Sequence, residues 1–317
     1  MTQVERIMKA DLPEKFICSS LAFLGRSSFE SRCVAAHREL ADCNFKYKHF
    51  FRSKDESERA VEIRKELSLT SDEVSVIDVS DPLQTHKTIR RQIQKIVELP
   101  EQTSLVIDTT TFRREELLIF LKEMAELPGY LLDEASFVYS VATSMGSWLS
   151  RNVRQIRPVI GYPGDILSRH STHLVILAGI EHHRAVAAID AFEPSVISLG
   201  MVPLEESVSA DIHERNLELR DYIVRHFDNV RCEFDFSAKD PQSVVNALEK
   251  VIGSRQDYNT VIAPLNTKLS TLGCGVYALK NQQVQLCYAE VEVYNAGDYS
   301  NIGDEVLLVP YRSLVGI

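Results

Sequence analysis

The chain has 317 residues, of which 35 are Lys or Arg and 45 are Asp or Glu, so its formal net charge is −10. Hydrophobic residues make up 44% of it, an ordinary globular composition that excludes wholesale disorder, collagen and long coiled coils. The acidic balance argues against non-specific binding to duplex DNA, because affinity for phosphates comes mainly from clustered Lys and Arg. At this length we expect two domains of roughly 150 residues each.

The sequence shows no targeting or membrane segment. Met1 to Lys15 is charged and has no apolar run of signal-peptide length, and no later segment has the ~18 consecutive apolar residues of a membrane helix. The cysteines are scattered without a Cys-x-x-Cys pair: Cys18, Cys33, Cys43, Cys232, Cys274 and Cys287. These features predict a soluble cytoplasmic protein with reduced, mostly buried thiols and no membrane partner.

Apolar runs alternate with amphipathic segments through the first half. The runs that we predict as strands are Phe16–Leu24, Tyr47–Phe51, Val74–Val79, Ser104–Asp108 and Ser136–Val141, with helix-period segments between them. Continuous apolar strands joined by helices are typical of a parallel sheet that is buried on both faces. The first half is therefore predicted to be an α/β domain.

The pattern breaks between Thr143 and His173, where Gly and Pro occur without apolar periodicity, and we interpret residues 146–172 as a connector. It then resumes with predicted strands at Leu174–Leu177, Val196–Leu199, Val230–Phe234, Thr260–Ala263 and Val284–Ala289. The apolar segment Val306–Val309 is expected to pack back as an edge strand.

The predicted architecture is two Rossmann-like α/β domains, residues 1–145 and 173–317, each a mostly parallel sheet with helices on both faces. The halves echo each other. Each has an apolar strand, a Gly and then a Glu–Arg pair at the start of a helix, Glu30 with Arg32 and Glu181 with Arg184. Either a duplication or the geometry shared by α/β folds explains this echo.

Loops that follow strands are where a ligand site is expected, because ligands of open parallel sheets bind beyond the carboxyl ends of the strands, near helix N-termini. The candidate ligand-binding residues in these loops are Glu30, Arg32, Thr109, Thr110, Arg113, Glu181, Arg184, Asn266, Thr267, Lys268 and Thr271. Together they suit a phosphate or carboxylate, and we expect their loops to converge at one sheet edge. Helix capping and local ion pairs are the alternative uses of the same side chains.

Complete catalytic motifs are absent from the sequence. There is no Walker loop, no Gly-x-Gly-x-x-Gly after the first strand and no Gly-x-Ser-x-Gly elbow, so no motif specifies a cofactor. Asp108, Glu181 and His183 are weak catalytic candidates. Asp108 stands where an aspartyl nucleophile would, but a haloacid-type phosphatase has a second Asp where this chain has Thr110.

Four histidines, His170, His173, His182 and His183, gather in one stretch. A predicted strand separates the two pairs, which places them too far apart to share one ion. We therefore predict no metal site.

These observations favour a protein that binds a nucleotide or another phosphorylated or anionic small molecule at its strand-end loops, as a sensor or regulatory module. The architecture is similar to the Rossmann-like nucleotide-sensing domains of prokaryotic regulatory and defence proteins, a resemblance that transfers no site residue. One alternative is a hydrolase or transferase that acts on a nucleotide or phosphosugar, and another is a protein-interaction subunit. The oligomeric state, including a homodimer, stays open.

Overall fold

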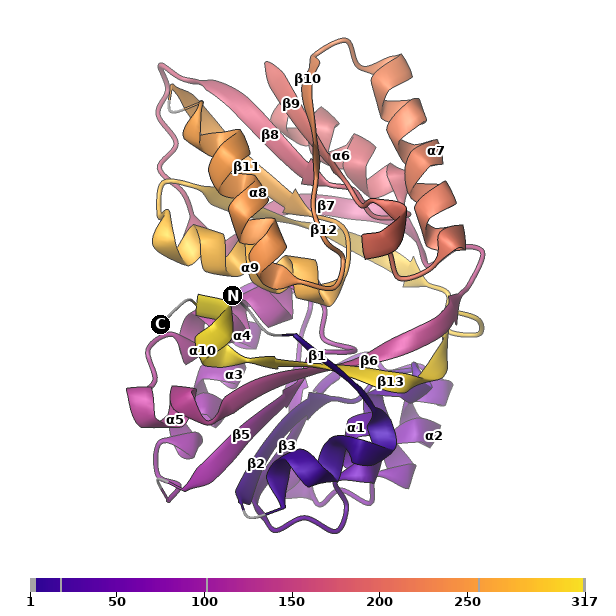
Figure 1. The fold of residues 1–317 in the computed structure, drawn as a ribbon, viewed down its shortest axis with the longest axis vertical. Coiled ribbons are helices and arrows are strands. Elements are labelled where there is room, and N and C mark those ends of the chain that lie inside the picture. The colour runs from indigo at the N-terminus through magenta and orange to yellow at the C-terminus, as the bar shows by residue number, and fades with distance from the viewer. Residues whose placement is uncertain (1–3, 18, 101, 256, 316–317) are drawn as a thin grey trace. The chain divides into compact units, whose positions relative to one another are not determined.

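A computed structural model of the chain describes residues 4–17, 19–100, 102–255 and 257–315, so Cys18 lies outside the described residues (Figure 1). The described chain is mixed α/β, with one seven-stranded and one six-stranded sheet, mostly parallel and flanked by helices. The predicted α/β class is thus confirmed. None of the helices in the described ranges is both long and apolar enough to cross a membrane.

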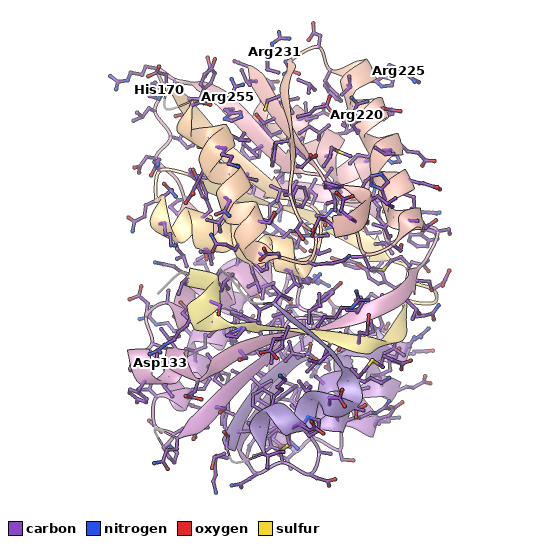
Figure 2. All side chains as sticks on the ribbon, viewed as in Figure 1. Asp133, His170, Arg220, Arg225, Arg231 and Arg255 are labelled. Atoms are coloured by element: carbon purple, nitrogen blue, oxygen red, sulfur yellow. The ribbon has the colours of Figure 1, made fainter. Side chains whose placement is uncertain are left out.

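Contacts divide the chain into two units. Unit 1 consists of Met1–Ser147 together with Ala296–Ile317, and unit 2 is Trp148–Asn295. Exposed charged side chains cover the outer parts of both, for example Asp133 in unit 1 and Arg225 and Arg231 in unit 2 (Figure 2).

The strands of unit 1 lie in the order β1-β13-β6-β5-β2-β3-β4. Those from β6 to β4 are parallel neighbours, whereas β13 runs antiparallel to both β6 and β1. Their bounds are β1 Glu5–Met8, β2 Ser20–Arg26, β3 Phe45–Ser53, β4 Val74–Ile77, β5 Thr103–Asp108, β6 Ala135–Met145 and β13 Ser300–Pro310. The helices are α1 Ala35–Glu39, α2 Glu58–Glu66, α3 Pro82–Ile96, α4 Arg114–Met124, α5 Gly129–Asp133 and α10 Tyr311–Val315, with 3₁₀ turns at Lys9–Phe16, Ser31–Val34 and Ser71–Glu73.

Local sequence explains these elements well where the signals are strong. Asp81 is the N-cap of helix α3, since its carboxylate accepts a hydrogen bond from the Gln84 N–H at 3.0 Å, and Pro82 occupies the first helical position. Its buried stripe includes Ile89 and Ile93. Every residue of β5 is buried, as expected for a central parallel strand.

The strands of unit 2 lie in the order β10-β9-β8-β11-β12-β7, all parallel to their neighbours except β7, which is antiparallel to β12. Their bounds are β7 Ser150–Pro163, β8 Ser171–Leu177, β9 Val196–Met201, β10 Val230–Asp235, β11 Tyr258–Pro264 and β12 Gln285–Tyr294. The helices are α6 His182–Phe192, α7 Ala210–His226, α8 Pro241–Gly253 and α9 Lys268–Lys280, with a 3₁₀ turn at Leu204–Glu206.

The two units exchange their antiparallel strands. After β6 the chain leaves unit 1 and forms β7, which pairs with β12 of unit 2. After β12 it returns and forms β13, which pairs with β6 of unit 1. Unit 2 thus receives β7 from the segment that follows β6 of unit 1. Unit 1 receives β13 from the segment that follows β12 of unit 2.

This exchange changes the predicted boundaries. The segment interpreted as a connector, residues 146–172, contains β7, and the tail belongs to unit 1 rather than to the second half. Because β7 is an edge strand, it tolerates the Pro residues that we interpreted as breaks, and Pro158 and Pro163 both lie within it. The tail was predicted to form an edge strand, but β13 lies between β1 and β6 and is therefore an inner strand of the sheet.

The core of unit 1 contains a histidine that should make folding sensitive to acid. The His37 ring packs against Phe23, Phe45 and Phe50, and burial lowers its pKa from 6.5 to about 4. The folded protein therefore resists protonation of His37. The contribution of this histidine to the free energy of unfolding is fully present above pH 6.5 and is lost as the pH falls towards 4.

Replacing this ring with a non-titrating one, His37→Phe, is expected to shift the midpoint of acid unfolding to lower pH, followed by circular dichroism. The matched control is His226→Phe, which changes an exposed histidine of α7 and should leave the midpoint in place. An unchanged midpoint in the His37 variant would show that this ring does not limit acid stability.

Candidate functional site

Three neighbouring parallel strands of unit 1, β2, β5 and β6, end at the same sheet edge. The first parallel strand, β2, has β3 on one side and β5 on the other, so the chain order reverses direction across the sheet between β2 and β5. In open α/β sheets this reversal is the usual place for a ligand. The loops there carry Arg26 to Ser28 after β2 and Asp108 to Thr111 after β5, and all of these residues are buried.

The threonines of the β5 loop hold the loop in place. Thr109 Oγ1 donates to the Val138 carbonyl at 3.0 Å, and Thr110 Oγ1 accepts from the Ser140 N–H at 2.9 Å. Thr111 Oγ1 donates to the Arg26 carbonyl at 2.5 Å. The loop is thus tied to β6 on one side and to the β2 loop on the other, so the hydroxyls of the predicted ligand residues Thr109 and Thr110 already have partners in the fold.

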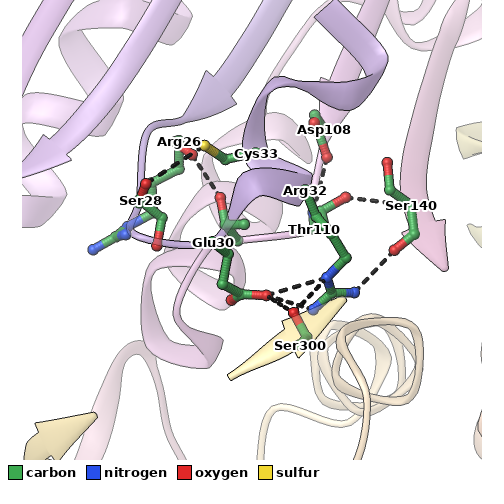
Figure 3. Close-up of polar contacts among 10 residues, drawn as sticks. Arg26, Ser28, Glu30, Arg32, Cys33, Asp108, Thr110, Ser140 and Ser300 are labelled. Carbon is green, nitrogen blue, oxygen red and sulfur yellow. Dashed lines mark hydrogen bonds and ion pairs between the residues drawn. The ribbon is translucent and has the colours of Figure 1, made fainter. Parts of the chain in front are cut away.

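Asp108 lies next to Thr110 in this group (Figure 3). Its side chain is buried, and Oδ1 accepts from the Thr110 N–H at 3.0 Å. The other oxygen, Oδ2, has no hydrogen-bond partner among the described residues. Burial raises the pKa of Asp108 from 3.8 to about 6, although the hydrogen bonds from Thr110 and the positive charge of Arg32 oppose the rise.

A second buried polar atom lies on the next strand. Ser140 is two residues beyond Val138, the last β6 residue paired with β5, and its Oγ also has no hydrogen-bond partner within the described ranges. A buried polar atom without a partner costs about 1–3 kcal/mol. Asp108 Oδ2 and Ser140 Oγ, on adjacent strands, are therefore an acceptor and a donor that the described part of the fold leaves unsatisfied.

Two buried ion pairs flank Asp108. Arg26 Nε lies 2.7 Å from Glu116 Oε2, and the same carboxylate oxygen accepts from the Arg113 N–H at 2.8 Å. The predicted ligand residue Arg113 is thus the N-cap of α4, and its backbone N–H is bonded to Glu116. The second pair is Glu30 with Arg32.

Arg32 is held by three kinds of acceptor (Figure 3). It donates to Glu30 Oε2 at 2.6 Å, to Ser300 Oγ at 3.0 Å and to the Ser140 carbonyl at 2.9 Å, while Ser300 Oγ donates to Glu30 at 2.8 Å. The guanidinium also lies over the Tyr139 ring. Burial alone would lower the pKa of Arg32, but the Glu30 carboxylate raises it above its usual value.

Unit 2 repeats this arrangement. Arg184 Nε lies 3.0 Å from Glu181 Oε2, and the guanidinium donates to Ser150 Oγ at 3.0 Å and to the Ala289 carbonyl at 3.4 Å. Ser150 Oγ in turn donates to Glu181, and the Arg184 guanidinium lies over the Tyr294 ring.

We call Glu30, Arg32 and Ser300 the first Glu–Arg–Ser triplet, and Glu181, Arg184 and Ser150 the second. Ser300 is the first residue of β13 and Ser150 the first residue of β7. Each triplet therefore joins the segment after the first parallel strand of a unit, β2 or β8, to the strand that the unit receives by exchange. The arginines are buried in both, which differs from the surface ion pairs that we considered as an alternative.

At the corresponding edge of unit 2 the loops after β8 and β11 touch directly. A Cβ on Gly179 would lie 2.0 Å from the Leu265 carbonyl oxygen, so only glycine fits there. Asn266 Nδ2 donates to the Ala178 carbonyl. The backbone of the β8 loop and the backbone of the β11 loop are thus in direct contact at this edge.

The other predicted residues of the β11 loop serve helix α9. Thr267 is its N-cap, since its Oγ1 accepts from the Ser270 N–H at 3.1 Å, and the same hydroxyl donates to the Ala238 carbonyl at 2.6 Å. Thr271 Oγ1 donates back to the Thr267 carbonyl at 2.9 Å, and Lys268 is the first residue of α9. These contacts match the capping role that we considered as an alternative.

The structure distributes the predicted residues over two sheets instead of one edge. Glu30, Arg32, Thr109, Thr110 and Arg113 belong to unit 1, whereas Glu181, Arg184, Asn266, Thr267, Lys268 and Thr271 belong to unit 2. Sequence reasoning missed Ser140, Ser150 and Ser300. The only sequence signal for Ser140 was its hydroxyl inside an otherwise apolar run. Ser150 and Ser300 could be identified as partners of the arginines only once the strand exchange was known.

The histidine pairs lie at opposite ends of β8, as predicted from the sequence. His183 Nε2 is 3.4 Å from Ser150 Oγ, and burial lowers the pKa of His183. Within the described ranges, no group of three or more His, Cys, Asp and Glu side chains could hold a metal ion. In comparisons with known proteins, no family model matches the chain, and no curated protein matches it.

The buried carboxylate should cost the free protein stability. Because the folded-state pKa of Asp108 lies near 6, above its ordinary 3.8, the free energy of unfolding falls as the pH rises from about 4 to about 6 and stays lower above that. Asp108→Asn keeps an acceptor for Thr110 and removes the charge, so it should raise the free energy of unfolding by about 1–3 kcal/mol at pH 7.5.

Urea unfolding at pH 7.5 and at pH 4 measures this effect, which should be small at the lower pH. Asp55→Asn, which changes an exposed aspartate of the same unit, is the control and should show no gain. An Asp108 variant that is no more stable than the wild type at pH 7.5 would contradict the assigned pKa.

Proposed function

We propose that the protein binds a nucleotide or a related phosphorylated sugar at the carboxyl edge of the unit 1 sheet, as a sensor or regulatory module, with Asp108 as the main polar contact. The observation that carries the proposal is the unsatisfied pair Asp108 Oδ2 and Ser140 Oγ on adjacent strands. The strand order β4-β3-β2-β5-β6 supports it, because the direction of the chain order reverses between β2 and β5, and Asp108 is the last residue of β5.

The chemistry of the pair suits a sugar. A sugar hydroxyl both donates and accepts, so neighbouring hydroxyls can donate to Asp108 Oδ2 and accept from the Ser140 hydroxyl. Helix α4 follows the Asp108 loop, and its first turn already carries the Glu116 carboxylate, which accepts from the Arg113 N–H. In unit 2 the loops after β8 and β11 approach each other closely at Gly179 and Leu265.

The raised pKa of Asp108 also supports a second candidate function, a hydrolase or transferase for the same ligand. A carboxyl group with a pKa of about 6 exchanges a proton readily near neutral pH, as a general acid or base must. Incubating the ligand with the protein and analysing it by chromatography separates the two functions. A ligand that returns unchanged supports the sensor, and a converted ligand supports the enzyme.

Binding is tested by a thermal-shift screen of nucleotides and phosphosugars, followed by titration calorimetry with each ligand that raises the melting temperature. Asp108→Asn and Ser140→Ala should each weaken binding by at least about tenfold. Ser104→Ala is the matched control, because it removes a buried hydroxyl at the other end of β5 and should leave affinity unchanged.

Since Asp108→Asn is expected to be more stable than the wild type, its loss of binding cannot be attributed to unfolding. A screen without any responding ligand, or an Asp108 variant that binds as tightly as the wild type, would overturn the proposal.

A further inference from the structure

A hollow of about 470 Å³ lies within unit 2, at the sheet edge opposite to the strand-end loops. The amino ends of β8, β11 and β12 meet the last residues of α8 and α9 there. Ile252, Val284 and the rings of Tyr258 and Tyr277 are among its lining residues. Its volume falls within the usual range for a small-molecule site, roughly 300–1,000 Å³.

The side chains in this hollow are rich in hydrogen-bond donors. Arg255 is partly buried, and its guanidinium makes no hydrogen bond or ion pair with the described residues. His170, at the same end of unit 2 (Figure 2), also lines the hollow with no such partner for its ring in the described ranges. The hydroxyls of Tyr258 and Tyr277 add two more donors, and burial raises the pKa of Tyr277 to about 12, which keeps it protonated.

The negative groups near the hollow have a weaker electrostatic effect than Arg255. The Asp165 carboxylate also lines it but is exposed, so water screens its charge. The carbonyls at the helix ends are capped: the Ile252 carbonyl accepts from the Arg255 N–H at 2.8 Å, and the Tyr277 carbonyl accepts from the Asn281 N–H at 3.0 Å. The charge of Arg255 therefore dominates, and it contributes to the lowered pKa of the nearby His173, after burial.

We propose that this hollow is a second ligand site, which binds a small organic anion with a flat ring. The carboxylate or phosphate group pairs with Arg255 and His170, and the ring packs between Tyr258 and Tyr277. A guanidinium binds carboxylate and phosphate alike in a two-pronged geometry. A nucleoside monophosphate and an aromatic carboxylate share this chemistry, and inorganic phosphate lacks the ring.

The test uses the full chain and three probes in titration calorimetry: adenosine 5′-monophosphate, benzoate and inorganic phosphate. At least one ring-bearing probe should bind, and more tightly than phosphate. Arg255→Gln should weaken it at least about tenfold and Tyr277→Phe about threefold. Arg225→Gln, an exposed arginine of the same unit (Figure 2), is the matched control and should have no effect.

Asp108→Asn separates this site from the one proposed in unit 1. Binding that survives Asp108→Asn and is lost in Arg255→Gln supports the second site, whether or not the unit 1 site exists. Binding that is lost only in Asp108→Asn supports the first site and overturns this one. The inference also fails if no probe binds the wild type, or if Arg255→Gln binds like the wild type.

Discussion

Ending the chain at Asn295 is expected to unfold unit 1 and leave unit 2 folded. The truncation removes β13, which pairs with both β6 and β1 and buries Val306, Leu307, Leu308 and Val309. Each of these side chains contributes about 1.5–3 kcal/mol, and together they match the whole stability of a typical domain, about 5–15 kcal/mol. Unit 2 loses none of its strands.

Hydrogen exchange measured by mass spectrometry gives the readout. Peptides from β2, β5 and β6 should exchange as freely as an unfolded chain, while those from β8 and β11 keep the protection that they have in the full-length protein. The fragment of residues 148–295 is the control and should show the same protection in β8 and β11. Protection retained in β5 after the truncation would contradict the described exchange of strands.

Removing the arginine of either Glu–Arg–Ser triplet should be among the most harmful single substitutions in the chain. Arg32→Ala leaves the buried Glu30 carboxylate without its ion-pair partner, and Arg184→Ala does the same to Glu181. We expect each change to lower the free energy of unfolding by about 3–5 kcal/mol, because an unpaired buried charge is strongly unfavourable. Urea unfolding measures it.

The exposed pair Arg38 and Glu66 is the matched control, and Arg38→Ala should cost less than about 1 kcal/mol. Adding Glu30→Gln to Arg32→Ala should recover part of the loss, since the uncompensated charge is then gone. If Arg32→Ala instead left stability unchanged and weakened ligand binding, Arg32 would be an anion-binding residue, as the sequence first indicated.

Much of the fold could be predicted because its local signals are strong. The buried run of β5 and the capped, amphipathic helix α3 each have the expected pattern. The exchange of β7 and β13 could not be predicted, because both strands pair with segments that are distant in the sequence. β7 pairs with β12, and β13 pairs with β6, which lies before unit 2 in the chain. Periodicity reports which side of a strand is buried but not which strand lies beside it.

For the candidate site, the sequence pointed to the strand-end loops and to Asp108 as a weak catalytic candidate, but it did not reveal the state of each polar group. Thr109 and Thr110 have the residue types of a ligand-binding turn, yet their hydroxyls are used to hold β6. Arg32 has the charge of an anion clamp, yet Ser300 and Glu30 occupy it. Which donors and acceptors remain available depends on contacts between distant segments, and no sequence motif records them.

The echo between the halves extends from the sequence to the strand order and the side-chain contacts. In both units a Glu–Arg pair after the first parallel strand contacts a serine at the start of the exchanged strand. Only unit 1 combines these Glu–Arg–Ser contacts with a buried carboxylate oxygen that lacks a hydrogen-bond partner in the described residues. The two units thus share one framework, and the proposed ligand site of Asp108 belongs to one of them.

The most direct test of the proposed function is a crystal structure of the protein with the nucleotide or phosphosugar that gives the largest thermal shift. The account predicts a ligand hydroxyl within hydrogen-bond distance of Asp108 Oδ2 and of Ser140 Oγ, with the ligand lying beyond the ends of β2 and β5. A ligand bound elsewhere, with Asp108 Oδ2 bonded instead to another group of the protein, would contradict it.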